Sequence, residues 1–205
     1  MSVDIDSSQV QDLEHLFEKF PDVARQAMSI ALNETARGPA LKAAKRNIMA
    51  QINFPEGYLD TRVEFKKPAT PYNLEARIVG RDRPTSLARF ASVGTPPAGP
   101  VGRASTVARG VNVTVKRGAP RRIPQGFLVH LRNSNIGLAI RLKPGETVRG
   151  VQRFNPVRLF PNVYLLYGPS VDQVLTDVGD QITEEVTSDI ATEFNRQFAR
   201  LSGLG

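Results

Sequence analysis

The sequence predicts an α+β protein in which helices at both ends flank a central antiparallel β region. Three observations lead to this class. Apolar residues recur every three or four positions within residues 1–53, alternate with polar residues across 58–167, and return to helical spacing over 170–202. With 205 residues, 40% of them apolar, the chain can fill one core, so we expect a single domain over residues 1–205.

The N-terminal region is expected to hold a short amphipathic helix followed by a longer one. The short helix follows the cap residues Ser7 and Ser8 and ends near residue 20. A second helix should begin at Pro21, because proline suits the first helical position. The Gly38-Pro39 pair should kink or divide it, since proline removes a backbone donor and disfavours helix at the preceding residue.

The central region shows the alternation of half-buried strands in several runs. Short connections such as residues 133–135 and 144–146 favour antiparallel pairing, because parallel pairing needs crossovers of about a dozen residues or more. We therefore expect a small sandwich or open barrel of five to six strands. A Pro/Gly-rich loop, residues 91–110, interrupts it and is long enough to be functional or ordered only on binding. The runs cover residues 59–65, 72–78, 111–115, 127–131, 136–142 and 163–167.

A long amphipathic helix is predicted for residues 170–202, where apolar side chains recur every three or four positions from Val171 to Leu201. Ser170 and Gln173 have the spacing of a capping box, in which the hydroxyl accepts from a backbone N–H of the first turn and the glutamine reaches back. Ser170 is therefore expected to cap this helix.

Ser170 could instead be a nucleophile, since it follows a glycine and a proline at the edge of an apolar run. A nucleophile elbow needs the pattern G-x-S-x-G and a histidine base, and the pattern is absent. Nothing in the sequence pairs His15 or His130 with the serine. A hydrolase built on Ser170, Asp172 and His130 is thus a rival interpretation, and the sequence favours no catalytic residues.

Cofactor and metal sites are not expected either. Cysteine is absent, and the chain has no H-E-x-x-H pattern. Glu184, Glu185 and Asp189 share one predicted helix, where we interpret them as a solvated face. Residues 94–99 match only the glycine spacing of a phosphate loop. The chain also has no apolar stretch of about 20 residues, so we expect a soluble protein made in the cytoplasm.

Charge is divided along the chain. The net charge is +7, but residues 1–20 carry −4 and residues 168–205 carry −5, which leaves +16 in between. That middle holds 24 of the 27 Lys and Arg residues. A field of one sign this strong indicates a polyanionic or acidic neighbour, although a solvated basic surface is the simpler interpretation. The acidic ends could themselves be that neighbour, within one subunit or across a subunit contact.

The remaining candidate chemistry is contact with nucleic acid or with an acidic partner. Cations in and beside the long loop can neutralise phosphates without reading sequence. Tryptophan is absent and tyrosine rare, so stacking on single strands is not expected. Binding should be insensitive to sequence and sensitive to salt. The candidate residues are Arg103, Arg109, Lys116, Arg117, Arg121 and Arg122.

Six short segments occur in a particular order over residues 23–198. They are 31–37 (ALNETAR), 73–80 (NLEARIVG), 87–90 (LARF), 110–115 (GVNVTV), 126–127 (GF) and 166–171 (LYGPSV). Together they resemble the minor tail protein Z family of long-tailed bacteriophages. No single segment is specific, but six in the same order make chance a poor explanation. The Pro/Gly-rich residues 94–102 and the Gly38-Pro39 break depart from the family pattern.

The resemblance implies a structural protein that completes the tail at its head-proximal end and allows it to join the head. It implies a homo-oligomeric ring of the virion tail, assembled in the host cytoplasm, with genomic DNA passing through. Its expected partners are the tail terminator, the head-tail connector and the tape-measure protein. The alternative is a free-standing, non-specific nucleic-acid-binding protein using the same arginines.

Overall fold

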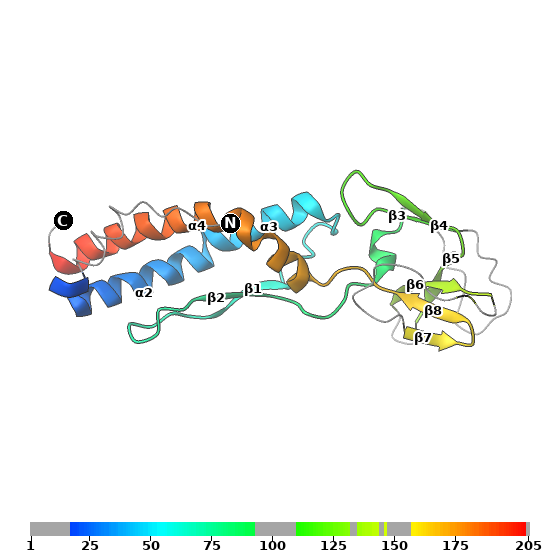
Figure 1. Cartoon of the computed structure of the whole chain (residues 1–205), viewed down its shortest axis with the longest axis horizontal. Helices are drawn as coiled ribbons and strands as arrows, with labels where there is room; N and C mark the ends of the chain where they lie inside the picture. The colour runs from blue at the N-terminus through cyan, green and yellow to red at the C-terminus, as the bar shows by residue number, and fades with distance from the viewer. Residues whose placement is uncertain (1–16, 93–109, 132–134, 144–145, 147–156, 204–205) are drawn as a thin grey trace. The chain divides into compact units, whose positions relative to one another are not determined.

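The computed structural model describes residues 17–92, 110–131, 135–143, 146 and 157–203. Within these ranges the chain combines helices with antiparallel sheets, so the predicted α+β class is confirmed. The helices are α2 (Pro21–Arg37), α3 (Pro39–Gln51) and α4 (Val171–Ser202), together with a short 3-10 helix, η1 (Leu87–Phe90). Figure 1 labels α2, α3 and α4.

The helix boundaries follow the prolines. α2 starts with Pro21 in its first turn, and Ala24 N donates to Phe20 O at 2.9 Å. At Gly38 the helix ends, with Gly38 N bonded to Glu34 O at 3.0 Å, and α3 begins at the next residue. The expected division at Gly38-Pro39 is therefore present. Of the predicted first helix, residues 17–20 fall within the described ranges, and residues 17–19 of these are helical.

The C-terminal part of α4 packs against α2, as Figure 1 shows. Phe194 and Phe198 are buried against three alanines of α2, Ala24, Ala27 and Ala31. Alanine side chains are short, so the rings approach the α2 backbone closely. Burial of one such phenylalanine contributes about 1.5–3 kcal/mol. These contacts hold the two helices side by side.

The first hairpin begins later than the alternation predicted. Its strands are β1 (Val63–Lys67) and β2 (Arg77–Gly80). Residues 57–62 form turns, closed by hydrogen bonds from Asp60 N to Gly57 O and from Val63 N to Leu59 O. The expected strand at residues 59–62 is therefore wrong, because Leu59 is buried from a turn and not from a strand. Residues 72–76 likewise precede β2.

The remaining strands form two further antiparallel sheets. β3 (Val111–Val113) pairs with β4 (Arg121–Ile123). The other sheet has four strands in the order β5-β6-β8-β7. Eight strands thus occur within the described ranges, more than the five to six expected, and their three sheets close no barrel. The four are β5 (Gly126–His130), β6 (Ile136–Arg141), β7 (Val157–Phe160) and β8 (Val163–Leu166).

The chain divides into two compact units. Unit 1 comprises Met1–Ala44, Glu64–Val79 and Gly179–Gly205, and unit 2 comprises Lys45–Val63 and Gly80–Val178. α3 and α4 each cross from one unit to the other without a break. The expectation of a single domain over residues 1–205 stays a prediction.

Candidate functional site

The two units carry opposite net charge. Unit 2 contains 18 Lys and Arg against six Asp and Glu, a net charge of +12, whereas unit 1 contains nine against 14, a net charge of −5. All six candidate cations belong to unit 2. The charge division seen along the sequence therefore follows the division into units.

Four of the six candidates lie on the β3–β4 hairpin. Lys116 and Arg117 stand in the connection, while Arg121 and Arg122 are the first two residues of β4, opposite Val113 and Asn112 respectively. All four cations are exposed. Neighbouring strand residues point to opposite faces, so Arg121 and Arg122 present charge on both faces of the hairpin. Arg103 and Arg109 lie outside the described residues.

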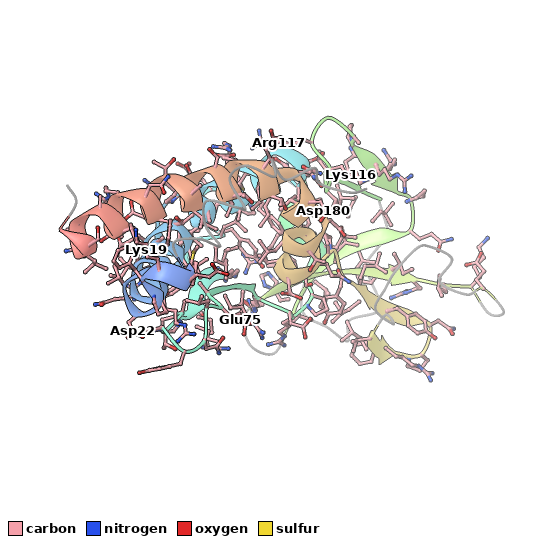
Figure 2. The ribbon with its side chains drawn as sticks, turned by 60° about the vertical axis from the view of Figure 1, so that its left-hand side comes forward. Lys19, Asp22, Glu75, Lys116, Arg117 and Asp180 are labelled. Atoms are coloured by element: carbon pink, nitrogen blue, oxygen red, sulfur yellow. The ribbon has the colours of Figure 1, made fainter. Side chains whose placement is uncertain are left out.

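Backbone hydrogen bonds fix the connection of this hairpin to the end of α3. Asn53 N donates to Val115 O at 2.8 Å, and Arg117 N donates to Gln51 O at 3.2 Å. Gly118 turns the chain with φ 72°, in the left-handed region that glycine adopts without strain. Figure 2 labels Lys116 and Arg117 at this connection. Both cations are thus presented from an anchored backbone, which lowers the entropy cost of contacting a ligand.

An open depression of about 400 Å³ adjoins Arg117. Met49, Phe54 and Leu59 lie along it, although Phe54 and Leu59 are each only 3% exposed, and its charged lining includes an ion pair between Lys45 Nζ and Asp60 Oδ1 at 3.2 Å. The residues belong to α3 and the turns after it, so no local sequence pattern marks the site. The remaining lining residues are Glu56 and Gly57.

Two arginines of unit 2 contact the ring of the buried Tyr58. The Cζ atoms of Arg62 and Arg89 lie 4.0 and 5.1 Å from the ring centroid of Tyr58. The Tyr58 hydroxyl is 3.2 Å from Thr85 Oγ1 in a buried hydrogen bond, and Phe54 stacks on the tyrosine ring at 5.0 Å. Cation–π contacts of this kind contribute about 0.5–2 kcal/mol. Part of the positive charge of unit 2 therefore stabilises its core.

Several of the segments that carry the family resemblance meet in unit 2. A Cβ added to Gly80 would stand 2.7 Å from the backbone of Asp172, so the end of β2 touches the start of α4. A Cβ on Gly168 would stand 3.1 Å from the Phe90 ring, and Thr114 N donates to Phe90 O at 2.8 Å. Close packing therefore accounts for these residues of the segments, with η1 at two of the three contacts.

Ser170 has the geometry of a helix cap. Gln173 N donates to Ser170 Oγ at 3.1 Å, and Ser170 N donates to Gln173 Oε1 at 3.2 Å. Both reciprocal hydrogen bonds of the capping box are thus present. The serine is fully buried, whereas a nucleophile has to reach a substrate. His130 is exposed at the end of β5, and His15 lies outside the described residues.

The described residues contain no group of three or more His, Cys, Asp and Glu that could hold a metal ion. On α4, Glu184 and Glu185 are exposed and Asp189 is half-buried. In the same part of the chain, no helix is long and apolar enough to cross a membrane.

Two carboxylates of unit 1 have altered acidity. Hydrogen bonds from Lys67, the larger cause, and from Arg77 hold the pKa of Glu75 below its usual value. A hydrogen bond from Arg196 likewise lowers the pKa of Glu193. Glu75 is labelled in Figure 2. Both shifts come from ion pairs on the surface, so they do not indicate an acid or base for catalysis.

No protein-family model, no curated protein and no solved structure matches the chain.

Proposed function

We propose that this chain is a structural protein of a bacteriophage tail that acts in tail completion and head-tail joining. In this proposal several copies form a ring at the head-proximal end of the tail, bordering the channel through which DNA passes. Its partners are the tail terminator, the head-tail connector and the tape-measure protein. The role is non-enzymatic.

The opposite net charge of the two units is the observation that carries the proposal. A chain with a +12 unit and a −5 unit can contact a neighbouring copy through unlike charges and still offer cations to DNA. The ordered resemblance of six segments to the minor tail protein Z family supports the location in a tail.

The exposed cations of the β3–β4 hairpin suit contact with passing DNA. Lys116, Arg117, Arg121 and Arg122 can meet phosphates on either strand, and such contacts carry no sequence information. A channel protein requires this property, because every part of the genome passes it. Contacts that are individually weak and screened by salt also let the DNA move.

A cryo-EM map of the intact head-to-tail junction tests the proposal. A ring of density for this chain, with the β3–β4 hairpins facing the channel, is the expected result. A ring whose hairpins are buried against another protein would keep the assembly role and remove the contact with DNA. Absence of the chain from the particle would refute the proposal.

The exposed hairpin also favours a second candidate function, a free-standing nucleic-acid-binding protein. Such a protein should bind duplex DNA as a monomer, with an affinity that falls steeply with salt. Sedimentation of the purified chain with and without duplex DNA separates the two. Oligomers without DNA favour the ring, and monomers that bind DNA tightly favour the alternative.

A further inference from the structure

Arg62 and Arg89 bring two positive charges together on the ring of Tyr58. Both Cζ distances, 4.0 and 5.1 Å, end at the centroid of that ring, so the two guanidinium groups lie within about 9 Å of each other. Arg81 adjoins them, because its N atom donates to Arg62 O at 2.8 Å. Like charges this close repel one another, and an anion among them would relieve the repulsion.

No carboxylate of the neighbouring segments neutralises this group of arginines. Asp82 follows Arg81 in the chain, and Asp172 N donates to Arg81 O at 3.2 Å. Within the described residues, however, neither aspartate forms an ion pair, and the same holds for the three arginines. With the exposed Arg83 included, the arginines exceed the aspartates by a net charge of +2. This local excess of positive charge is open to an external anion.

The two side chains on the ring differ in their accessibility. Arg62 is half-buried, and its Nη1 atom donates to Tyr58 O at 2.9 Å and to Thr61 Oγ1 at 3.1 Å. Arg89 is exposed, and in the part of the chain that the structure describes its guanidinium group donates to no oxygen atom. Arg89 can therefore contact a ligand directly, while Arg62 adds positive potential beside it.

The guanidinium group of Arg89 is held in place before any ligand binds. Its ring partner Tyr58 is buried, and is fixed by the hydrogen bond between its hydroxyl and Thr85 Oγ1 and by stacking on Phe54. An arginine on an aromatic face keeps its planar donors for phosphate oxygens. A group that is already in position also loses less entropy on binding.

Backbone hydrogen bonds join the segment around Arg89 to the β3–β4 hairpin. Thr114 N donates to Phe90 O at 2.8 Å, and Ser92 N donates to Asn112 O at 3.0 Å. Arg89 and the cations of the hairpin are thus presented by one hydrogen-bonded part of unit 2. Duplex DNA carries a charge about every 1.7 Å along its axis, so one duplex can contact both, whereas a single carboxylate reaches only one of them. This arrangement favours DNA as the ligand.

We propose that Arg89 is a further DNA-contact residue, which binds a backbone phosphate while Arg62 strengthens the positive potential around it. The inference rests on the proposed contact of the β3–β4 hairpin with DNA, and it extends that surface to η1. Two separate contacts constrain how unit 2 is oriented on the duplex, which a single hairpin does not.

Fluorescence anisotropy of the full chain with a labelled duplex, over a salt series, tests the contact. Arg89→Gln should weaken binding about eightfold at about 0.1 M salt and lower the salt slope of log K by about 0.9, the values for one phosphate contact. Arg89→Lys should keep the native slope, because the positive charge remains. Arg141→Gln is the matched control, since it removes an exposed charge from β6 in the same unit, and its affinity should stay near the native value.

Chemical modification of the native chain tests the same contact without a substitution, so misfolding of a variant cannot explain the result. Phenylglyoxal modifies accessible arginine side chains, and peptide mass spectrometry gives the rate at each position. Saturating duplex DNA should slow the modification of Arg89 several-fold and leave the rate at Arg141 nearly unchanged. Polyglutamate at the same charge concentration should protect Arg89 less than the duplex does.

An Arg89→Gln variant that binds like Arg141→Gln would overturn this inference, as would equal modification of Arg89 with and without duplex. Equal protection by polyglutamate would assign Arg89 to acidic proteins and also overturn it. A native chain that binds no duplex would refute the DNA contact of the hairpin together with the inference. Binding that responds to the four hairpin cations but not to Arg89 refutes the inference alone, so the two failures are distinguishable.

Discussion

At the scale of the residue, polar side chains with two hydrogen bonds fix the ends of elements. Ser170 and Gln173 exchange hydrogen bonds at the start of α4, and Asn33 bonds both backbone groups of Ala69 beside the β1–β2 turn. Each pairing satisfies backbone groups that the regular ladders leave open. Loss of either side chain would leave those groups without a partner.

Ser170→Ala should lower the free energy of unfolding by about 1 kcal/mol, the usual cost of removing a helix cap. The backbone N–H of Gln173 would then lose its acceptor, the Oγ atom of the fully buried Ser170. Urea unfolding followed by circular dichroism measures the change. Ser188→Ala, at an exposed position inside α4, is the control and should change stability little. Equal stability of the Ser170 variant and the native protein would contradict the cap.

Glu75 should make the stability of unit 1 depend on pH. The pKa of Glu75 is lowered in the folded state by the hydrogen bonds of Lys67 and Arg77. A carboxyl with a lowered folded pKa stabilises the fold above its unfolded pKa, and this contribution is lost as the pH falls through the folded pKa. The urea midpoint should therefore decrease less between about pH 6 and pH 3 for Glu75→Gln than for the native chain.

Glu64→Gln is the matched control on the same hairpin, since the Glu64 carboxylate lies 3.7 Å from the Lys66 ammonium and makes the weaker pair. It should leave most of the pH dependence in place. Identical pH profiles for the Glu75 variant and the native protein would show that the ion pairs do not persist in solution.

At the scale of the element, two glycines at α4 differ in whether the packing leaves room for a side chain. Gly80, at the end of β2, touches the backbone of the first turn of α4, while Gly179 lies inside α4 with nothing within 4 Å of an added Cβ. The first glycine is required by close packing. The second has no such requirement, and glycine within a helix costs stability relative to alanine.

Gly179→Ala should therefore stabilise the protein by about 0.5–1 kcal/mol. Gly80→Ala should destabilise it by roughly 1–3 kcal/mol, because the new methyl group would stand 2.7 Å from backbone atoms that have to shift. Thermal unfolding of the two variants in one buffer provides the comparison. A stabilising Gly80→Ala would mean that β2 and α4 do not touch.

The sequence predicts elements of this chain best where one side chain pattern decides them. The start and length of α4 follow from the capping box of Ser170 and Gln173 and from the apolar spacing between Val171 and Leu201. The starts of α2 and α3 follow from Pro21 and Pro39. β4 and β7 escaped prediction because each has only three or four residues and no clear alternation. Leu59 was misassigned because a buried turn residue can imitate a strand pattern.

The candidate site was predictable only in part. The cations of the β3–β4 hairpin were recognisable from their crowding in the sequence. The contacts of Arg62 and Arg89 with Tyr58 were not, since they join residues far apart in the chain and leave no local pattern. The same holds for the depression, whose lining ranges from Lys45 to Arg117.

At the scale of the whole molecule, charge distribution matters more than net charge. The value of +7 hides the difference between a +12 unit and a −5 unit. The affinity for a polyanion should therefore depend on which Lys and Arg residues are substituted, and not only on how many.

Changing Lys116, Arg117, Arg121 and Arg122 together to glutamine should weaken binding to duplex DNA and reduce the salt slope of log K by about three to four. The control changes Arg25, Lys42, Lys66 and Arg200 of unit 1 to glutamine. It removes the same net charge from exposed positions and should leave the slope nearly unchanged. Fluorescence anisotropy over a salt series measures both, and equal slopes would show that the hairpin is not the binding surface.

The strand order β5-β6-β8-β7 has a consequence for the rate of folding. β5 with β6, and β7 with β8, are local hairpins, the second turning at Asn162 with φ 62°. Hairpins form in about 1–10 μs. The pairing of β6 with β8 joins more distant residues, such as Leu138 and Leu166, and must first close the intervening chain. The slow step in assembling this sheet is therefore the meeting of two preformed hairpins at its centre.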